Sequence, residues 1–319
     1  MPIGRCPSIV DRPFVYPPRV AAPARTLRRI RQRLLTWYAA DRRDFPWRRT
    51  NDPWAVLVSE VMLQQTQASR VVERFPPFLR RFPTTEAMAA VSEAEVLVEW
   101  AGLGYNRRAL ALRRVATEVQ RGGWPSDVDG LRRLPGIGAY TSRAVAALAF
   151  GKPVGAVDTN VRRWLTRRFG LPVPADAGLL QELADGLAIA DQGVSADDAA
   201  AWMHASMEFG GRVCRARAPD CPACPIARGC PSRNRATHVP VKRQAAFAGS
   251  DRALRGTLVR RMTANPRRQM TLAAARRLAG ARLEPMIAAL ERDRLAHRSG
   301  RLLILGGPAG ERAPTTIGA

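Results

Sequence analysis

Recurrent helical periodicity is the feature that most constrains the fold of this 319-residue chain. Apolar residues return at the three- and four-residue spacing of a buried helix face, and turn-forming residues separate each such segment from the next. Alternating patterns typical of strands are scarce. Helices are predicted at 26–40, 54–75, 92–101, 107–121, 139–150, 159–169, 177–190 and 199–209. The bulk of the chain is therefore predicted to be all-α.

Changes in composition divide the chain into consecutive segments. Residues 1–24 are rich in proline and are predicted to be a flexible N-terminal segment ahead of a helical domain at 25–235. Residues 236–250 are predicted to be a linker. Residues 251–307 join two or three short helical patterns to the alternating stretch "HRSGRLLILGG". This order predicts a small winged-helix domain, followed by a tail at 308–319.

The charge balance indicates a polyanionic partner. The chain has 51 Lys and Arg against 27 Asp and Glu, a formal net charge of +24. Such an excess favours nucleic acid as the partner and says nothing about the fold. No stretch has the apolar length of a membrane span or the pattern of a secretory signal. The expectation is a cytoplasmic, nucleoid-associated monomer with no membrane contact.

Four cysteines are spaced C-x6-C-x2-C-x5-C, at Cys214, Cys221, Cys224 and Cys230. Such thiols can form disulfides, a zinc site or an iron–sulfur cluster. A reducing compartment disfavours disulfides. Structural zinc usually takes two close Cys-x2-Cys pairs and only one is present, so the spacing favours a [4Fe–4S] cluster while zinc stays open. Cys6 is predicted to take no part.

The stretch "SEVMLQQTQA", residues 59–68, places one carboxylate in an apolar helix and then turns polar. Apolar residues surround the axis of this helix, which is typical of burial on most sides. Burial would raise the pKa of Glu60 and keep a proton on it, as a general acid requires. The alternative is that Glu60 faces solvent beside Ser59 and Gln67 as an ordinary helix residue.

A second motif, "LPGIG" at 134–138, lies between two helical segments. Gly136 and Gly138 permit a tight turn, and the exposed N–H groups of the following helix could hold a DNA phosphate, with Arg143 adding charge. An ordinary interhelical turn is the alternative. Asp158 stands directly before the next helical pattern, where an N-cap is its simplest role.

Together these motifs resemble the MutY-type adenine DNA glycosylases of the helix–hairpin–helix superfamily. The resemblance runs from about residue 26 to residue 233. It rests on the order and spacing of "DFPWR", "SEVMLQQTQ", "GLGYNRRA", "LPGIGAYTSRAV", "VDTNVRR" and the four cysteines. The hairpin, the aspartate and the cysteines are shared with endonuclease III, whereas "EVMLQQT" is typical of the adenine-removing branch.

The resemblance implies a role for each motif. Glu60 would protonate N7 of a flipped-out adenine, and Asp158 would stabilise the positive charge that develops on the sugar, with Tyr140 and Asn160 holding the aspartate and the substrate. The resemblance also implies a [4Fe–4S] cluster on the four cysteines and double-stranded DNA with a mispaired or damaged base as the partner. The DNA contacts it implies are Gln65, Thr66, Tyr105, Gly136, Gly138 and Arg143.

The sequence departs from the family in its C-terminal region, which is too short for the Nudix-like domain that recognises 8-oxoguanine. Excision opposite 8-oxoguanine or guanine is still the expected activity. Tyr140 stands where a lyase would carry its lysine, so the enzyme is expected to be monofunctional. The alternatives are a thymine or uracil mismatch glycosylase and a non-enzymatic iron–sulfur DNA-binding protein.

Overall fold

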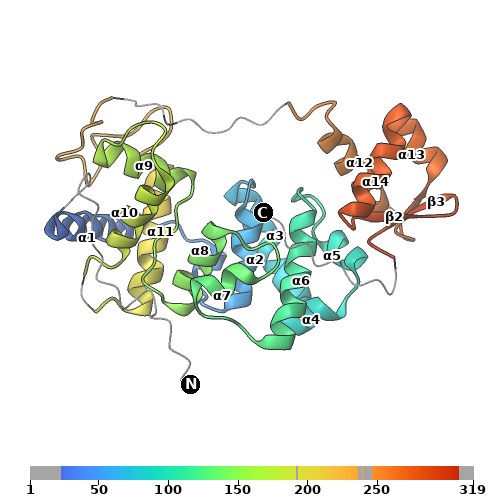
Figure 1. Cartoon of the computed structure of the whole chain (residues 1–319), viewed down its shortest axis with the longest axis horizontal. Helices are drawn as coiled ribbons and strands as arrows, with labels where there is room; N and C mark the ends of the chain where they lie inside the picture. Colours follow the sequence, from blue (N-terminus) through green and yellow to red (C-terminus); the bar gives the residue numbers. More distant parts are fainter. Residues whose placement is uncertain (1–22, 192, 236–238, 240–245, 309–319) are drawn as a thin grey trace, which may run out of the picture. The chain divides into compact units, whose positions relative to one another are not determined.

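The computed structural model describes residues 23–191, 193–235, 239 and 246–308 and forms two compact units (Figure 1). The first unit comprises Met1–Asp44 and Ser142–Val241, and the second comprises Phe45–Thr141 and Lys242–Ala319. Cys6 lies outside the described residues. Among the described helices, none combines the length and hydropathy needed to cross a membrane.

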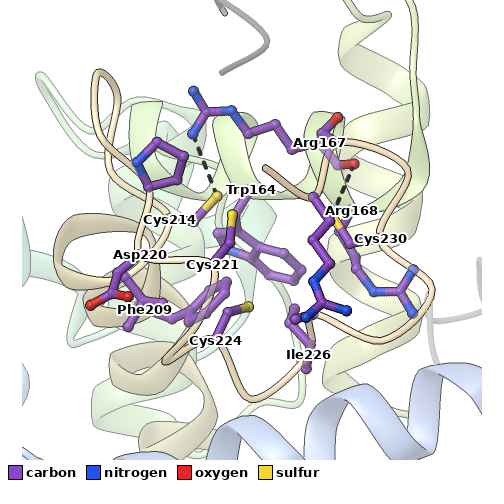
Figure 2. A pocket seen from close by; sticks show the side chains of 15 residues that line it. Trp164, Arg167, Arg168, Phe209, Cys214, Asp220, Cys221, Cys224, Ile226 and Cys230 are labelled. Carbon is purple, nitrogen blue, oxygen red and sulfur yellow. Dashed lines mark hydrogen bonds between the residues drawn. The ribbon is translucent and has the colours of Figure 1, made fainter. Parts of the chain in front are cut away.

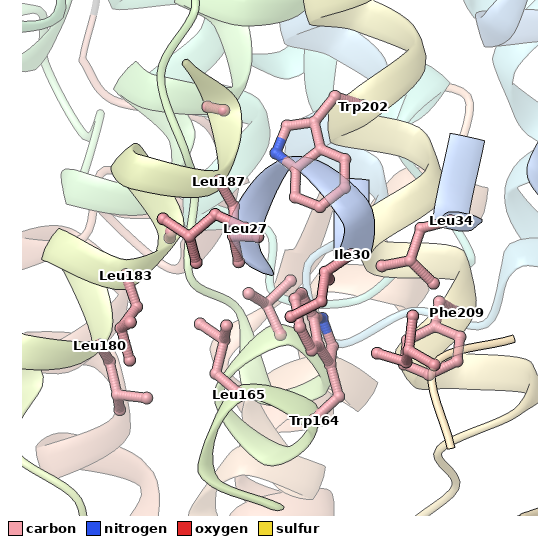
Figure 3. Packing of buried hydrophobic residues seen from close by; sticks show 14 of the residues in the cluster. Leu27, Ile30, Leu34, Trp164, Leu165, Leu180, Leu183, Leu187, Trp202 and Phe209 are labelled. Atoms are coloured by element: carbon pink, nitrogen blue, oxygen red, sulfur yellow. The ribbon is translucent and has the colours of Figure 1, made fainter. Parts of the chain in front are cut away.

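Four helices build the core of the first unit: α1 (Ala24–Asp41), α9 (Thr159–Phe169), α10 (Ala177–Ala188) and α11 (Ala196–Arg212). Figure 3 shows Leu27 and Ile30 of α1 facing Trp164 and Leu165 of α9 and Leu187 of α10. Full burial of each such side chain contributes about 1.5–3 kcal/mol. A fifth helix, α8 (Ala139–Phe150), begins at the end of the second unit's first segment.

The local signals for these helices lie at their ends. Asp158 caps α9 by accepting a hydrogen bond from the Val161 N–H at 2.6 Å, and Gly170 ends the helix with a left-handed φ of 63°. In α11, a Cβ at Gly210 would lie 2.7 Å from the carbonyl oxygen of Asn160. Only glycine therefore permits this close approach of α11 to the start of α9.

In the second unit, every residue of α2 (Pro53–Leu63) from Trp54 to Met62 is buried, where the sequence predicted burial on most sides. Asp52 caps it by accepting from the Ala55 N–H at 2.8 Å. The prediction of one helix over 54–75 is wrong, because the chain breaks at Gln64 and resumes as α3 (Ala68–Arg81). Gln65 has a φ of 57°, which an α-helix cannot contain.

The remaining helices of this part of the second unit follow in chain order. These helices are η2 (Pro46–Arg48), α4 (Thr85–Ala90), α5 (Glu93–Glu99), α6 (Arg107–Gly122) and α7 (Val128–Arg133). Both α5 and α6 match predicted segments, whereas α4 and α7 are short helices of six residues that the periodicity did not predict.

The C-terminal residues fold as the expected winged helix, here called the winged-helix segment (251–307; orange to red in Figure 1). Its elements are α12 (Asp251–Ala264), β1 (Gln269–Thr271), α13 (Leu272–Ala279), η3 (Gly280–Arg282), α14 (Leu283–Arg292), β2 (Ala296–Ser299) and β3 (Leu302–Leu305). The three short strands form an antiparallel sheet in the order β1-β3-β2, and the β2–β3 hairpin is the wing. The predicted fold class, all-α with this small addition, is confirmed.

Candidate active site

The predicted site residues divide between the two units. In the second unit, Glu60 is 4% exposed, within the wholly buried stretch of α2. Its neighbour Ser59 donates its hydroxyl to the Val56 carbonyl at 2.8 Å and is buried as well. The alternative in which Glu60 is a solvated helix residue is therefore excluded.

The polar turn after α2 presents Gln65 to solvent. Its left-handed φ makes it one of few non-glycine residues in the described part of the chain with such a backbone. Thr66 donates its hydroxyl to the Gln64 carbonyl at 3.3 Å, and the Gln64 side chain donates to the Thr141 hydroxyl at 3.2 Å. The turn is therefore tied to the first turn of α8, which follows the LPGIG motif.

A second loop of this unit ends in an exposed aromatic side chain. Tyr105 is 42% exposed and has a φ of 48°. The indole N–H of Trp100 donates to the Gly104 carbonyl at 2.9 Å, and this hydrogen bond holds the loop next to Tyr105. The Tyr105 ring is therefore exposed on a loop that is held by a side-chain hydrogen bond.

One guanidinium holds both of these loops, and the sequence reasoning missed it. Arg108 of α6 donates to the carbonyls of the turn after α2 and of the Tyr105 loop, and its cation lies 5.3 Å from the centre of the Tyr105 ring. Its acceptors are Val61 O (2.6 Å), Met62 O (3.2 Å), Gln64 O, Thr66 Oγ1 (3.2 Å), Leu103 O (3.3 Å) and Gly104 O (3.2 Å). Burial lowers the pKa of Arg108 to about 10, so it remains a cation at neutral pH.

The LPGIG motif forms the turn from α7 to α8. Gly136 has a φ of 77°, and a Cβ there would lie 2.9 Å from the Cβ of Ala111. Gly138 lacks a left-handed φ, and the space around its missing side chain is open. The first glycine is therefore required by the fold, whereas the second leaves room for a close ligand. Tyr140 follows in α8 and is half-buried.

Arg143, predicted from the sequence to contact DNA, is engaged inside the first unit. Its guanidinium donates to Asp185 Oδ1 at 2.6 Å and to the Gly155 carbonyl at 3.1 Å. Only 19% of its side chain is exposed. These bonds give Arg143 a structural role in joining α8 to α10.

Asp158 stands half-buried at the head of α9 in the first unit. Its Oδ1 accepts from the Val161 N–H at 2.6 Å, and its Oδ2 accepts from the Asn160 side-chain amide at 2.9 Å. Burial raises the pKa of the carboxyl, while these two hydrogen bonds and the charge of Arg163 act in the opposite direction. The predicted N-cap role is confirmed, and Asn160 is brought to the aspartate as expected.

Arg163 extends this contact to the cysteine loop, which periodicity alone could not reveal. Its Nη2 donates to Asn160 Oδ1 at 2.8 Å and to the Gly210 carbonyl at 2.6 Å. Its Nε donates to the Cys214 carbonyl at 2.8 Å. A continuous chain of hydrogen bonds therefore runs from Asp158 to the backbone of the first cysteine.

The four cysteines line one pocket of the first unit, with apolar walls from Trp164, Phe209 and Ile226 (Figure 2). Arg167 borders this pocket and donates to Cys214 Sγ at 3.6 Å. None of the four is in a disulfide. In the described ranges, no three His, Cys, Asp or Glu side chains converge as ligands of one metal ion.

Burial disfavours the thiolate form of two cysteines in this pocket. Burial raises the pKa of Cys224 to about 11 and raises that of Cys230 as well, although Arg168 opposes the shift at Cys230. A bound metal displaces such protons, because thiolates and not thiols are its ligands. Arg167 also donates to the Arg215 and Ala216 carbonyls at 2.6 and 2.9 Å, which fixes the loop that carries Cys214. The pocket therefore supplies the thiol donors that a thiolate-bound metal group takes.

Comparison with known proteins places these features in a family. Residues 58–187 match the model of the HhH-GPD superfamily base excision DNA repair proteins. The adenine DNA glycosylase of Mycobacterium tuberculosis is 40% identical over 263 residues, which are 79% of this chain and 82% of that protein. The thymine/uracil-DNA glycosylase of Pyrobaculum aerophilum is 32% identical over 209 residues, 62% of this chain and 89% of that protein.

A solved structure of a DNA glycosylase is also similar to this chain. A thermostable thymine-DNA glycosylase superposes with a TM-score of 0.60 at 31% identity, over 66% of this chain and 99% of that chain. The residues matched by the family model, 58–187, include Glu60, the LPGIG turn and Asp158. The chain therefore belongs to the adenine DNA glycosylases of the HhH-GPD superfamily.

Proposed function

We propose that this protein removes mispaired adenine from double-stranded DNA by hydrolysing its N-glycosidic bond. The observation that carries the proposal is Glu60: a carboxyl 4% exposed in an apolar helix, directly ahead of a rigid polar turn. Family membership supports the substrate, since the adenine DNA glycosylase of Mycobacterium tuberculosis matches over most of both chains. The chain is accordingly a DNA N-glycosylase.

Glu60 is proposed as the general acid. Burial disfavours the charged form of a carboxyl and so favours the form that can donate a proton. Protonation at N7 of adenine allows the base to leave as a neutral molecule, which is the purpose of an acid in this reaction.

Asp158 is proposed to oppose the positive charge that develops on the sugar as the bond breaks. This role requires the ionised form, which burial disfavours. The hydrogen bonds from the Val161 N–H and the Asn160 amide favour the ionised form, and Arg163 holds Asn160 in place. Tyr140 is proposed to help hold the substrate.

The exposed loops of the second unit are proposed to hold the DNA. Gln65 and Thr66 would contact the base opposite the adenine, and Tyr105 would enter the stack during flipping. Gly136 and Gly138 would let the hairpin backbone approach a phosphate at the head of α8. Arg143 is left out of this proposal, because its guanidinium is already engaged with Asp185.

Duplexes with a single mispair test the proposed function. Adenine opposite 8-oxoguanine or guanine should be released with the strand left intact, and borohydride should trap no covalent adduct, because an imine requires an amine nucleophile. Lys152, the lysine nearest Asp158 in sequence, is exposed beyond the end of α8. Release of thymine or uracil opposite guanine, with adenine untouched, would support the activity named for the Pyrobaculum relative instead.

We propose that Cys214, Cys221, Cys224 and Cys230 hold a [4Fe–4S] cluster, which would fix the loop between α11 and residue 235. The purified protein should be yellow-brown and contain about four iron atoms per chain. Cys221→Ser should lose iron and bind DNA more weakly, whereas Cys6→Ser should keep both properties. Elemental analysis that finds zinc in place of iron would contradict the cluster.

A further inference from the structure

The winged-helix segment carries a charge excess that the excision chemistry does not use. Residues 251–308 contain thirteen arginines and no lysine against four carboxylates. A winged helix commonly binds DNA with the second helix of its helix pair, here α14, in the major groove. The two ends of this segment and the exposed face of α14 differ in their contacts and charge.

One end of the segment docks on the other helices of the second unit. The Arg294 guanidinium donates to Glu93 Oε1 at 2.8 Å, and the Gly307 N–H donates to Glu93 Oε2 at 2.8 Å. Both charged side chains of this pair are nearly buried, with 12% and 11% exposed. Asp293 adds a 3.5 Å ion pair with Arg107 of α6. Since both α14 and β3 end at this contact, it fixes the segment by one end.

The wing lies at the opposite end of β3. The hairpin turns at Gly300, whose φ is 55°, and the Arg301 carbonyl accepts from the Leu272 N–H at 2.9 Å, at the start of α13. Wing and α13 are therefore neighbours, away from the docked end. Arg301 on the wing and Arg277 on α13 are exposed, and the structure of the described residues shows no carboxylate paired with either.

The exposed face of α14 is unsuited to a DNA groove. Its solvent-facing residues include Glu284 and Glu291, whose charge repels phosphate. Arg298 of β2 binds both carboxylates. Its backbone N–H donates to Glu291 Oε1 at 2.9 Å, and its guanidinium donates to Glu284. The side chain of Arg298 thus lies along the helix, across the face that a groove-reading helix would present.

We propose that the winged-helix segment is a second contact for duplex DNA, made through phosphates by Arg301 of the wing and Arg277 of α13, with α14 kept out of the groove. The proposal rests on the proposed function only in that duplex DNA is the ligand. Contacts to phosphate carry no sequence information, so the segment adds affinity and fixes register without reading bases. It lengthens the stretch of duplex held beyond the glycosylase helices.

The salt dependence of binding by the full-length chain tests this proposal. Each phosphate contact contributes about 0.9 to the slope of log K against log salt, so Arg277→Ala with Arg301→Ala should reduce the slope by about 1.8. Binding to an undamaged duplex is measured by fluorescence anisotropy between 50 and 200 mM salt. Undamaged DNA is used so that the result does not depend on adenine excision.

Arg292→Ala is the matched control, because Arg292 is also exposed but lies at the docked end of α14. Its slope should equal that of the unmodified protein, while Arg301→Ala alone should lose about 0.9. Thermal unfolding checks that all variants are folded. An unchanged slope for the double variant would overturn the proposal, as would an equal loss for Arg292→Ala, which would show that the charge acts diffusely.

Discussion

Glu60→Gln should abolish adenine excision while the protein still binds mispaired DNA. The amide has nearly the size and the hydrogen-bonding capacity of the acid, so the buried site in α2 can keep its packing. The amide of the variant cannot donate an acidic proton to the leaving base. Removal of a general acid typically costs about 10²–10⁴-fold in rate, and single-turnover kinetics on a duplex with adenine opposite 8-oxoguanine measures this loss directly.

Glu99→Gln provides the control for exchange of a carboxyl for an amide. Glu99 ends α5 in the same unit and is half-buried, and its side chain has no assigned role in the chemistry. This variant should excise adenine at the normal rate. If Glu60→Gln excised at a rate close to that of Glu99→Gln, with both proteins folded, Glu60 would not be the acid.

The helical skeleton could be predicted because its signals are local. The predicted segments 139–150 and 159–169 coincide with α8 and α9, since a capping aspartate and terminal glycines are readable in the sequence. Burial of α2 on most sides was also predictable, because its apolar residues surround the helix axis. The winged helix followed from short helices and an alternating hairpin pattern.

The break after α2 could not be predicted, because its cause is distant in sequence. The run from Gln64 to Gln67 contains neither glycine nor proline, and its polar side chains suit an exposed helix face. The left-handed backbone of Gln65 is sustained by Arg108, which reaches the turn from α6. Such a backbone costs on the order of 1–3 kcal/mol at a non-glycine residue, so the fold must supply an opposing interaction.

The contact between Asp158 and the cysteine loop was hidden for the same reason. The resemblance assigned Asn160 to the aspartate, but it gave Arg163 no role. Only the packing of α9 on α11, which Gly210 permits, brings the Arg163 guanidinium between Asn160 and the Cys214 carbonyl. Side chains that act by joining distant segments leave no periodic signal in the sequence.

Arg108→Met should slow adenine excision by about 10²-fold, the cost of displacing reacting groups by roughly 1 Å. The methionine fills the space but leaves the carbonyls around Gln64 and Gly104 without their common donor. Both Gln65 and Tyr105, each with a left-handed backbone, would then lose the group that fixes their loops. The excision rate of Arg108→Lys should lie between those of the unmodified protein and Arg108→Met, because a single ammonium cannot span both loops as a planar guanidinium does.

Arg113→Met separates this positioning role from a general loss of stability. Arg113 lies on the same helix and is also half-buried. It donates to the Val91 and Ala89 carbonyls at 2.7 and 3.4 Å, at the end of α4, where no DNA contact is proposed. Both methionine variants should unfold at lower temperature, since each leaves buried carbonyls unpaired at about 1–3 kcal/mol apiece. Only Arg108→Met should also excise slowly at saturating enzyme and bind the mispaired duplex weakly. If Arg108→Met and Arg113→Met had matched melting temperatures and equal excision rates, Arg108 would contribute only to stability. A loop displaced by the loss of Arg108 would have to alter binding or excision of the base.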